Sequence, residues 1–350
     1  MARPLNALLL TRLREFFREP EAIFWVYGFP VLLAVGLGIA FRDKPAERIR
    51  VDVQVTAAGV PAAGDPAAAA LQALGAAGGF ETAPCAADAC HDRLRLGRTD
   101  IVMVPGAPVT YLYDPTRPES VLARARVDDA LQRSAGRADA LATKDDHVRE
   151  PGSRYIDFLI PGLLGMNLMG GGLWGIGFVI VDMRVRRLLK RLVATPMRRT
   201  DFLLAMMGSR LIFMLPEVAL LLLAGTLLFG VVVKGSLLAV AAVSILGAVS
   251  FAGLGLLVAC RAQKIETVSG LMNVVMLPMW LLSGIFFSSD RFPAALQPFI
   301  KVLPLTMLNE ALRAVILEGA TLPSQWLRLA GLVAWGGVSF VLALRWFRWN

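Results

Sequence analysis

The chain has 350 residues, 56% of them hydrophobic, and a mean hydropathy of +0.60, an apolar share that predicts an integral membrane protein and argues against a soluble one. Its formal net charge of +9 arises outside residues 42–150, which hold 14 Lys and Arg against 16 Asp and Glu. The excess cations therefore flank apolar runs in the positive-inside pattern, and without a basic groove and interleaved aromatics the sequence argues against nucleic acid as a partner.

Residues 1–22 are expected to form an N-terminal interfacial amphipathic helix, because leucine and phenylalanine recur there at helical spacing among arginines. Residues 23–41 carry no charge and match the thickness of a bilayer, so we expect the first transmembrane helix in this range. The alternative interpretation is a secretory signal peptide, which the lengths of the apolar run and of its lead-in disfavour.

Residues 42–152 differ from the rest in composition and predict a small α/β domain. The predicted strands are residues 51–55, 101–104 and 109–113, and the predicted helices are residues 66–76, 87–97 and 119–141. Because four arginines precede the first span and the domain is close to neutral, we expect this domain to be extracytoplasmic.

Cysteine and histidine do not form a metal-binding pattern. The three cysteines, Cys85, Cys90 and Cys260, lack the spacing of zinc ligands, and both histidines fall in the polar domain. The spacing of Cys85 and Cys90 permits a disulfide outside the cytoplasm and equally permits two unpaired thiols. We expect no metal in this chain.

Residues 153–350 are expected to form a membrane domain with five further transmembrane helices and a cytoplasmic segment at residues 182–201. The predicted spans are residues 155–181, 203–233, 237–259, 268–287 and 326–344. Residues 288–323 mix charged, apolar and proline residues, so we expect amphipathic or re-entrant helices there. Six spans put both termini in the cytoplasm and predict a multi-pass protein of the plasma (inner) membrane.

The cytoplasmic segment is strongly basic. Residues 184–199 carry seven cations and no acid, so they can form neither a span nor a buried strand and must lie at a polar surface. One interpretation is an orientation signal whose cations contact only anionic membrane lipid.

Five stretches of the chain carry a family resemblance. They are YIDFLIPGLL at residues 155–164, LVATPMRR at 192–199, PMWLLSGIFF at 278–287, LPLTMLNEALR at 303–313 and YLYDPTRPES at 111–120. As a set, they resemble the permease subunits of ABC-2 type exporters, in the variant with a large extracytoplasmic first loop. The resemblance implies an α-helical integral membrane protein with six transmembrane helices and a small extracytoplasmic α/β domain between the first and second.

The resemblance also implies a permease that forms the substrate pathway as a homodimer or heterodimer and is driven by separate cytoplasmic ABC ATPase subunits. The sequence contains no G-x-x-x-x-G-K-[ST] loop to cradle ATP phosphates. We therefore expect ATP and Mg in the partner ATPase, and neither enzyme activity nor a cofactor in this chain.

In this interpretation the basic segment couples the permease to its ATPase. The expected coupling residues are Arg186, Arg187, Leu188, Lys190, Arg191, Leu192, Thr195 and Pro196. An apolar ridge of Leu188, Leu189, Leu192 and Val193 is expected to seat in a groove of the ATPase, with the cations meeting acidic rims or lipid phosphates.

Polar side chains within predicted spans are candidates for a substrate pathway. Glu217 lies deep in a span with no cation within four residues, so it should face protein or water, or be protonated. One candidate pathway residue is Glu217, with a role toward substrate or protons. The others are Asn167, Met169, Asn273, Met276 and Trp280, which the resemblance places at a cavity between two permeases. Structural hydrogen bonding and ordinary packing are the alternative interpretation.

Glu310 and Arg313 fall near the predicted outer surface. Their spacing of three residues predicts a local helix pair, and a role in closing an extracellular gate is the alternative hypothesis.

A second class of function stays open on the sequence. It is a membrane scaffold or sensor protein whose extracytoplasmic domain binds a ligand or partner without transport. A membrane enzyme is disfavoured, because the predicted spans hold no constellation of nucleophile, base and metal.

Overall fold

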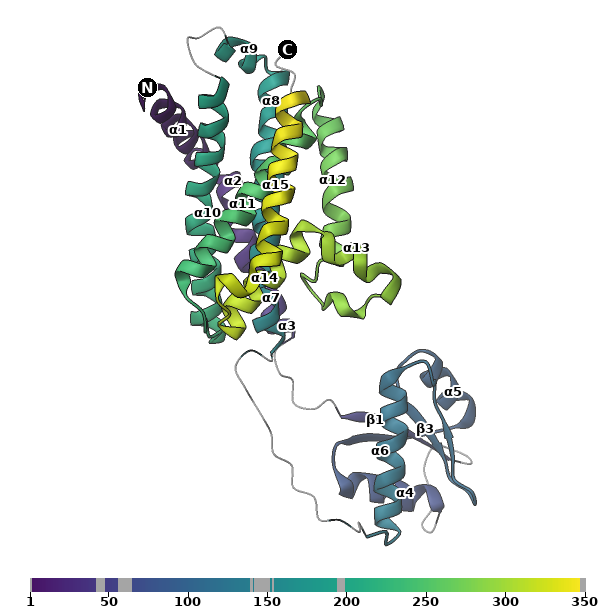
Figure 1. The fold of residues 1–350 in the computed structure, drawn as a ribbon. Coiled ribbons are helices and arrows are strands. Elements are labelled where there is room, and N and C mark those ends of the chain that lie inside the picture. Colours follow the sequence, from purple (N-terminus) through teal and green to yellow (C-terminus); the bar gives the residue numbers. More distant parts are fainter. Residues whose placement is uncertain are drawn as a thin grey trace. The chain divides into compact units, whose positions relative to one another are not determined.

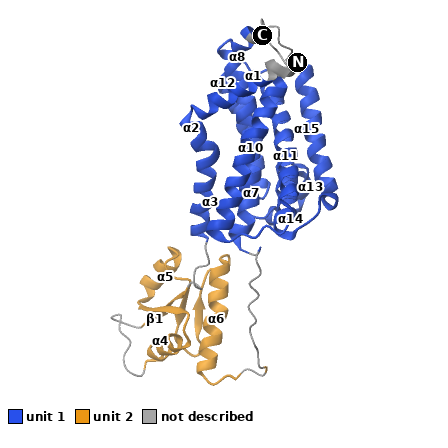
Figure 2. Ribbon diagram, turned by 90° about the vertical axis from the view of Figure 1, so that its left-hand side faces the viewer, with its two compact units in different colours: residues 1–42, 148–350 blue, residues 43–147 orange. Residues whose placement is uncertain are grey.

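The computed structural model describes residues 2–41, 48–55, 65–138, 141, 152, 154–193 and 199–346. It divides the chain into two compact units (Figure 2). Met1–Arg42 together with Val148–Asn350 form the membrane unit, and Asp43–His147 form the α/β unit. Each unit has a hydrophobic core of its own.

The described part of the membrane unit is helical (Figure 1). Its elements are α1 (Ala2–Phe17), α2 (Pro20–Ile23), the π-helical η1 (Phe24–Gly28), α3 (Phe29–Ala40), α7 (Tyr155–Gly172), the π-helical η2 (Leu173–Phe178), α8 (Val179–Val185), α9 (Leu188–Val193), α10 (Arg199–Phe229), α11 (Leu237–Ala259), α12 (Ile265–Leu282), the 3-10 helices η3 (Ser289–Arg291) and η4 (Ala294–Leu296), α13 (Gln297–Val302), α14 (Pro304–Glu318), the 3-10 helix η5 (Leu322–Gln325) and α15 (Trp326–Trp346).

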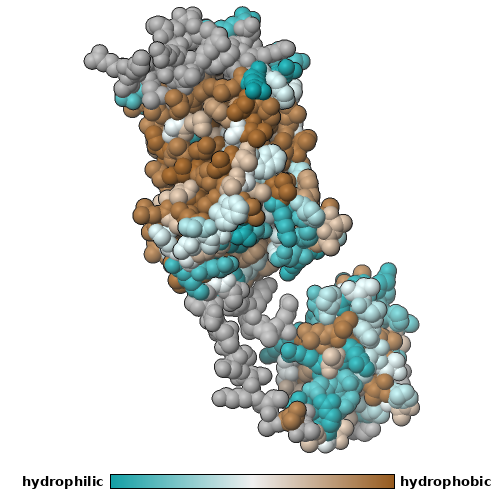
Figure 3. Space-filling model, viewed as in Figure 1, coloured by the Kyte–Doolittle hydropathy of each residue, from teal (hydrophilic) through white to brown (hydrophobic). Residues whose placement is uncertain are grey.

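Among the described residues, six helical stretches are long and apolar enough to cross a membrane. They are Pro20–Ala40, Tyr155–Val185, Phe202–Phe229, Leu237–Ala259, Ile265–Leu282 and Leu322–Trp346. Figure 3 shows one face of the membrane unit covered by an apolar band, with hydrophilic residues gathered beyond it. The predicted fold class is confirmed: the chain is a helical, multi-pass membrane protein with a small α/β unit between its first and second spans.

Glycines let the central helix α11 approach its neighbours closely. A methyl group on Gly255 would overlap the carbonyl oxygen of Gly172 in α7, and one on Gly253 would lie 2.8 Å from the carbonyl oxygen of Gly336 in α15. Gly172 also packs against the fully buried Phe251 of α11. Since lipid provides no hydrophobic drive for helix association, such close van der Waals packing holds the spans together.

Helix α14 is buried within the membrane unit and is not one of the six candidate spans. It is 15 residues long and packs against α7, α11 and α15, with Leu305, Leu308 and Leu312 fully buried. The side chain of Asn309 donates from Nδ2 to the carbonyl oxygen of Ser283 at 2.9 Å. A short helix covered by protein in this way is compatible with the amphipathic or re-entrant helices expected for residues 288–323.

Helix α1 packs along the first half of α10. Leu9 fills the space left by Gly208, and the ring of Phe16 lies 4.2 Å from that of Phe213, centroid to centroid. The amphipathic helix expected at residues 1–22 is therefore attached to the bundle through its apolar side.

In the described part of the α/β unit, the strands form a mixed sheet in the order β2-β1-β3-β4. The strands are β1 (Ile49–Gln54), β2 (Phe80–Cys85), β3 (Ile101–Val104) and β4 (Thr110–Leu112). β1 is parallel to both β2 and β3, and β4 is antiparallel to β3. Helices α4 (Pro66–Ala77) and α6 (Pro118–Ser134) cover one face, and α5 (Ala87–Arg95) covers the other.

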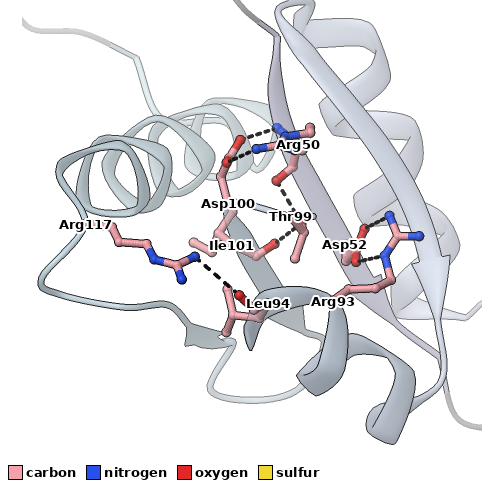
Figure 4. Close-up of polar contacts among 8 residues, drawn as sticks. All are labelled: Arg50, Asp52, Arg93, Leu94, Thr99, Asp100, Ile101 and Arg117. Carbon is pink, nitrogen blue, oxygen red and sulfur yellow. Dashed lines mark hydrogen bonds and ion pairs between the residues drawn. The ribbon is translucent and has the colours of Figure 1, made fainter. Parts of the chain in front are cut away.

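A buried ion pair ties α5 to the sheet. Asp52 in β1 is 1% exposed, and its carboxylate accepts hydrogen bonds from Nε and Nη2 of Arg93 at 2.6 and 3.2 Å (Figure 4). Asp100 caps the same strand by accepting from the backbone and side chain of Arg50. These contacts compensate carboxylates that burial would otherwise penalise.

We predict that Arg93→Leu destabilises the α/β unit by about 2 kcal/mol, because it leaves the buried carboxylate of Asp52 without its cation, which is itself half-exposed. Hydrogen–deuterium exchange of β1 in the full chain measures the loss as faster exchange. Arg95→Leu is the matched control, since Arg95 and Asp92 form an exposed pair worth less than roughly 1 kcal/mol. Equal exchange of β1 in the two variants would contradict the assignment.

Cys85 and Cys90 form a disulfide between β2 and α5, and Cys260 is a buried free thiol. Such a bridge persists in oxidising compartments. We predict that the purified, denatured chain takes up maleimide at one cysteine without reductant and at all three after reduction, as counted by mass spectrometry. The variant Cys260→Ser should take up none without reductant; two labels on it would show that the bridge is absent.

Candidate functional site

Exposed cations cluster where α8 meets α9. Arg186, Arg187, Lys190 and Arg191 are all exposed, and Arg186 forms an ion pair with Asp182 one turn earlier at 2.9 Å. Arg187, Lys190 and Arg191 are among the residues expected to couple to an ATPase, and by that expectation we call them the coupling cations. Arg187 has a left-handed backbone (φ 58°), which turns the chain sharply out of α8. The coupling cations therefore form a basic surface at the end of two membrane spans.

The described leucines of α9 lie on its bundle side, and the expectation that the apolar ridge contacts a partner is corrected for Leu189. Leu189 is 1% exposed and belongs to the core of the membrane unit. Leu188 is half-buried and faces residues of α1 and α10 across a cavity. A six-residue helix at the end of a bundle can bury only one side, and among the described side chains Leu189 occupies it.

Three other expected coupling residues have no described side chain. Thr195 and Pro196 lie outside the described residues, as does the side chain of Leu192.

Arg184 has a structural role at the same end of the bundle. Its guanidinium donates to the carbonyl oxygens of Ala259, Cys260 and Ala262, where α11 ends. These carbonyls have no partner within the helix, so the arginine caps α11 and fixes α8 beside it.

Glu217 forms an intramembrane ion pair that the sequence analysis did not predict. Nη2 of Arg210 lies 2.9 Å from Oε2 of Glu217, and the two side chains are 6% and 3% exposed. The residues are seven positions apart on α10, so they share one face two turns apart. No cation lies within four residues of Glu217, but a cation seven positions earlier on the same helical face is a signal in the sequence for this pair.

The guanidinium of Arg210 also reaches α7. It donates to the carbonyl oxygen of Asn167 at 3.3 Å and occupies the space over Gly171, where any β-carbon would overlap it. Isolated charges are strongly disfavoured in the membrane, whereas a cation that meets a carboxylate and a carbonyl is tolerated. Arg210 therefore links α10 to α7 at the middle of the membrane unit.

The remaining candidate pathway residues fall into two groups. Asn167 is half-buried, and Asn273 and Trp280 are exposed on α12. Met169 and Met276 are 0% and 3% exposed and pack in the core. The expectation that these two methionines line a pathway is thus corrected, because they point into the bundle and fill its interior.

A partly open face of α7 and η2 continues from Asn167. Trp174 is 36% exposed, and nothing lies within 4 Å of the place where Gly170 would carry a β-carbon. The π-helical turn at Leu173–Phe178 follows directly, and such turns are frequent at functional sites. The face combines one amide, small residues and an aromatic ring.

An apolar groove of about 550 Å³ lies at the end of α12. It is lined by Leu277, Pro278, Trp280, Leu281, Leu282, Phe286 and Phe287. Its size matches that of sites for small organic molecules.

Glu310 and Arg313 have different partners, so the expected local pair does not form. Glu310 accepts from Nε of Arg328 at 2.9 Å. Arg313 donates to the carbonyl oxygens of Phe158 and Gly284, and its guanidinium carbon lies 3.6 Å above the centre of the Phe158 ring. Arg313 therefore ties α14 to the start of α7.

Comparison with known proteins agrees with this architecture of a membrane permease. The model of the ABC-2 type transporter family matches residues 128–317, more than half of the chain. The chain belongs to the ABC-2 type transporter family, and the matched region contains the coupling cations, the Arg210–Glu217 pair and α14.

Two relatives give more distant matches. The probable multidrug ABC transporter permease YbhS of Escherichia coli K12 is 26% identical over 163 residues, which cover 46% of this chain and 43% of YbhS. ABC transporter G family member 20 of Dictyostelium discoideum is 25% identical over 194 residues, which cover 55% of this chain and 26% of that protein. The chain thus spans less than half the length of each relative. No solved structure matches it significantly.

Proposed function

We propose that this chain is the membrane subunit of an ATP-driven exporter, in which separate cytoplasmic ATPase subunits bind the coupling cations. The observation that carries the proposal is the exposure of Arg187, Lys190 and Arg191 on a short helix between two spans. Clustered cations on a rigid helix suit an acidic docking groove. ATP and Mg would bind the ATPase, since this chain has no phosphate-binding loop.

A physical link connects this surface to the spans. Leu189 anchors α9 in the core, so α9 cannot move without shifting its neighbours. Arg210 joins α10, the helix that follows α9 in the chain, to α7, the helix that precedes α8 and α9. Closure of the ATPases would then move α7 and α10 together, as alternating access requires.

The substrate pathway would lie between two copies of the permease. The partly open face of α7 and the exposed Asn273 and Trp280 of α12 provide polar and aromatic groups inside the membrane. YbhS is named a probable multidrug permease, and we extend that substrate class to this chain as amphipathic organic molecules. An apolar wall with few polar groups suits such molecules.

The proposed location is the inner membrane, with both termini in the cytoplasm and the α/β unit outside. The arginines before the first span and the coupling cations would then share the cytoplasmic side, as the positive-inside rule requires. The disulfide of the α/β unit supports an oxidising location for it.

The test is co-purification with ABC ATPases of the same organism, beginning with any that a neighbouring gene encodes. We expect an equimolar complex whose ATP turnover rises when an amphipathic dye is added. A permease that purifies without the ATPase, and leaves its turnover unchanged in mixtures, would favour the scaffold or sensor function instead.

A further inference from the structure

A cavity of about 560 Å³ lies between α1, the start of α10 and the α8–α9 connection. One part of its wall is apolar and includes Leu8, Leu188, Phe202 and Met206. Another part is charged and comes from α1 and the two residues that follow it. A cavity with this division suits a ligand that has one apolar end and one ionic end.

The charged part has an excess of cations. Arg12, Arg14 and Arg18 line it together with Glu15 and Glu19. Arg12 holds Glu15 in an ion pair at 2.7 Å. Arg14 and Arg18 are exposed and have no ion-pair partner among the described residues, and the buried Nε of Arg12 lacks an acceptor there. The cavity therefore offers guanidinium donors to an anion.

The depth of the cavity identifies the environment of that anion. Phe202 is the first residue of a candidate span. Helix α1 precedes the first candidate span and contains several arginines. The cavity thus lies at the boundary between the apolar and polar layers of the membrane, where lipid phosphates are found. Basic pockets at this level bind anionic lipid head groups.

We propose that the cavity binds an anionic glycerophospholipid, with its head group against Arg14 and Arg18 and the start of an acyl chain on Phe202 and Met206. Guanidinium groups form strong paired hydrogen bonds with phosphate, and their apolar stems can lie against the chain. Leu188 of α9 is part of the wall, so the bound lipid steadies the helix that carries the coupling cations. This lipid site depends on the chain being a membrane protein and does not depend on the proposed export function.

The test uses the full chain, purified in a neutral detergent and titrated with phosphatidylglycerol or, separately, phosphatidylcholine. We expect phosphatidylglycerol to raise the melting temperature by about 3–6 °C and phosphatidylcholine to raise it by less than half as much. Native mass spectrometry should show one tightly retained phosphatidylglycerol per chain. Equal shifts with both lipids would overturn the proposal, as would an equal shift with inorganic phosphate alone.

Two variants remove the site in different ways. Arg14→Gln/Arg18→Gln removes the cations, and Leu8→Trp fills the cavity without changing its charge; both should abolish the retained lipid and the phosphatidylglycerol shift. Lys264→Gln is the matched control, an exposed cation at the start of α12 that does not line the cavity. If both variants retain the lipid as Lys264→Gln does, the lipid binds elsewhere and the proposal is wrong.

Discussion

Arg210→Met is expected to lower the stability of the membrane unit by about 3–5 kcal/mol, because it leaves the carboxylate of Glu217 buried in the membrane without a cation. In a bundle of this size the melting temperature of the detergent-purified chain should fall by roughly 10 °C. The substitution also removes the donor to the carbonyl oxygen of Asn167, which loosens α7 from α10.

The double variant Arg210→Met/Glu217→Leu separates the ion pair from simple packing. Replacing both charges removes the desolvated carboxylate, so most of the lost stability should return. Arg291→Met, at an exposed position after α12, is the control and should melt like the unaltered chain. If the double variant has a lower melting temperature than Arg210→Met, the unpaired carboxylate of Glu217 is not the cause of the lost stability.

Reversing the coupling cations with Arg187→Glu/Lys190→Glu/Arg191→Glu is expected to weaken binding of the ATPase by roughly 10- to 100-fold. Each exposed charge contributes about 0.5–1 kcal/mol to an interface, and three act together. The melting temperature should stay unchanged, because the described coupling cations are exposed. Surface-immobilised permease and soluble ATPase measure the affinity directly.

The matched control reverses charges elsewhere on the membrane unit. Arg291→Glu/Lys301→Glu changes two exposed cations in the segment between α12 and α14. It should bind the ATPase with unaltered affinity. Equal loss in both sets would mean that net charge, and not the α9 surface, attracts the ATPase. Unchanged affinity for the ATPase in both sets of variants would show that the coupling cations do not bind the ATPase.

The spans were predictable because each is a long apolar run, and that signal is set by the bilayer thickness. The strand β2 (Phe80–Cys85) was not predicted. Its sequence, FETAPC, lacks alternation and contains Pro84, which edge strands tolerate. Its position follows from pairing with β1 alone, which is a tertiary contact.

The side-chain partners in the candidate site were the least predictable feature. Arg210 and Glu217 are two turns apart, and neither reveals from the sequence that Gly171 leaves space for the guanidinium. The exposed cations of α9 were predicted from their charge. The inward direction of Leu188 and Leu189 was not, because a six-residue helix has too few positions to show which side the bundle covers.

Transport by proteoliposomes tests the central claim most directly. The chain is reconstituted with the ABC ATPase that co-purifies with it, and movement of an amphipathic fluorescent dye is followed with ATP present. The account predicts ATP-dependent transport that stops when the ATPase carries a hydrolysis-blocking substitution and falls at least tenfold, at limiting ATPase, in the variant with all three coupling cations reversed. Dye movement of equal rate with and without ATP, or with and without the coupling cations, would contradict it.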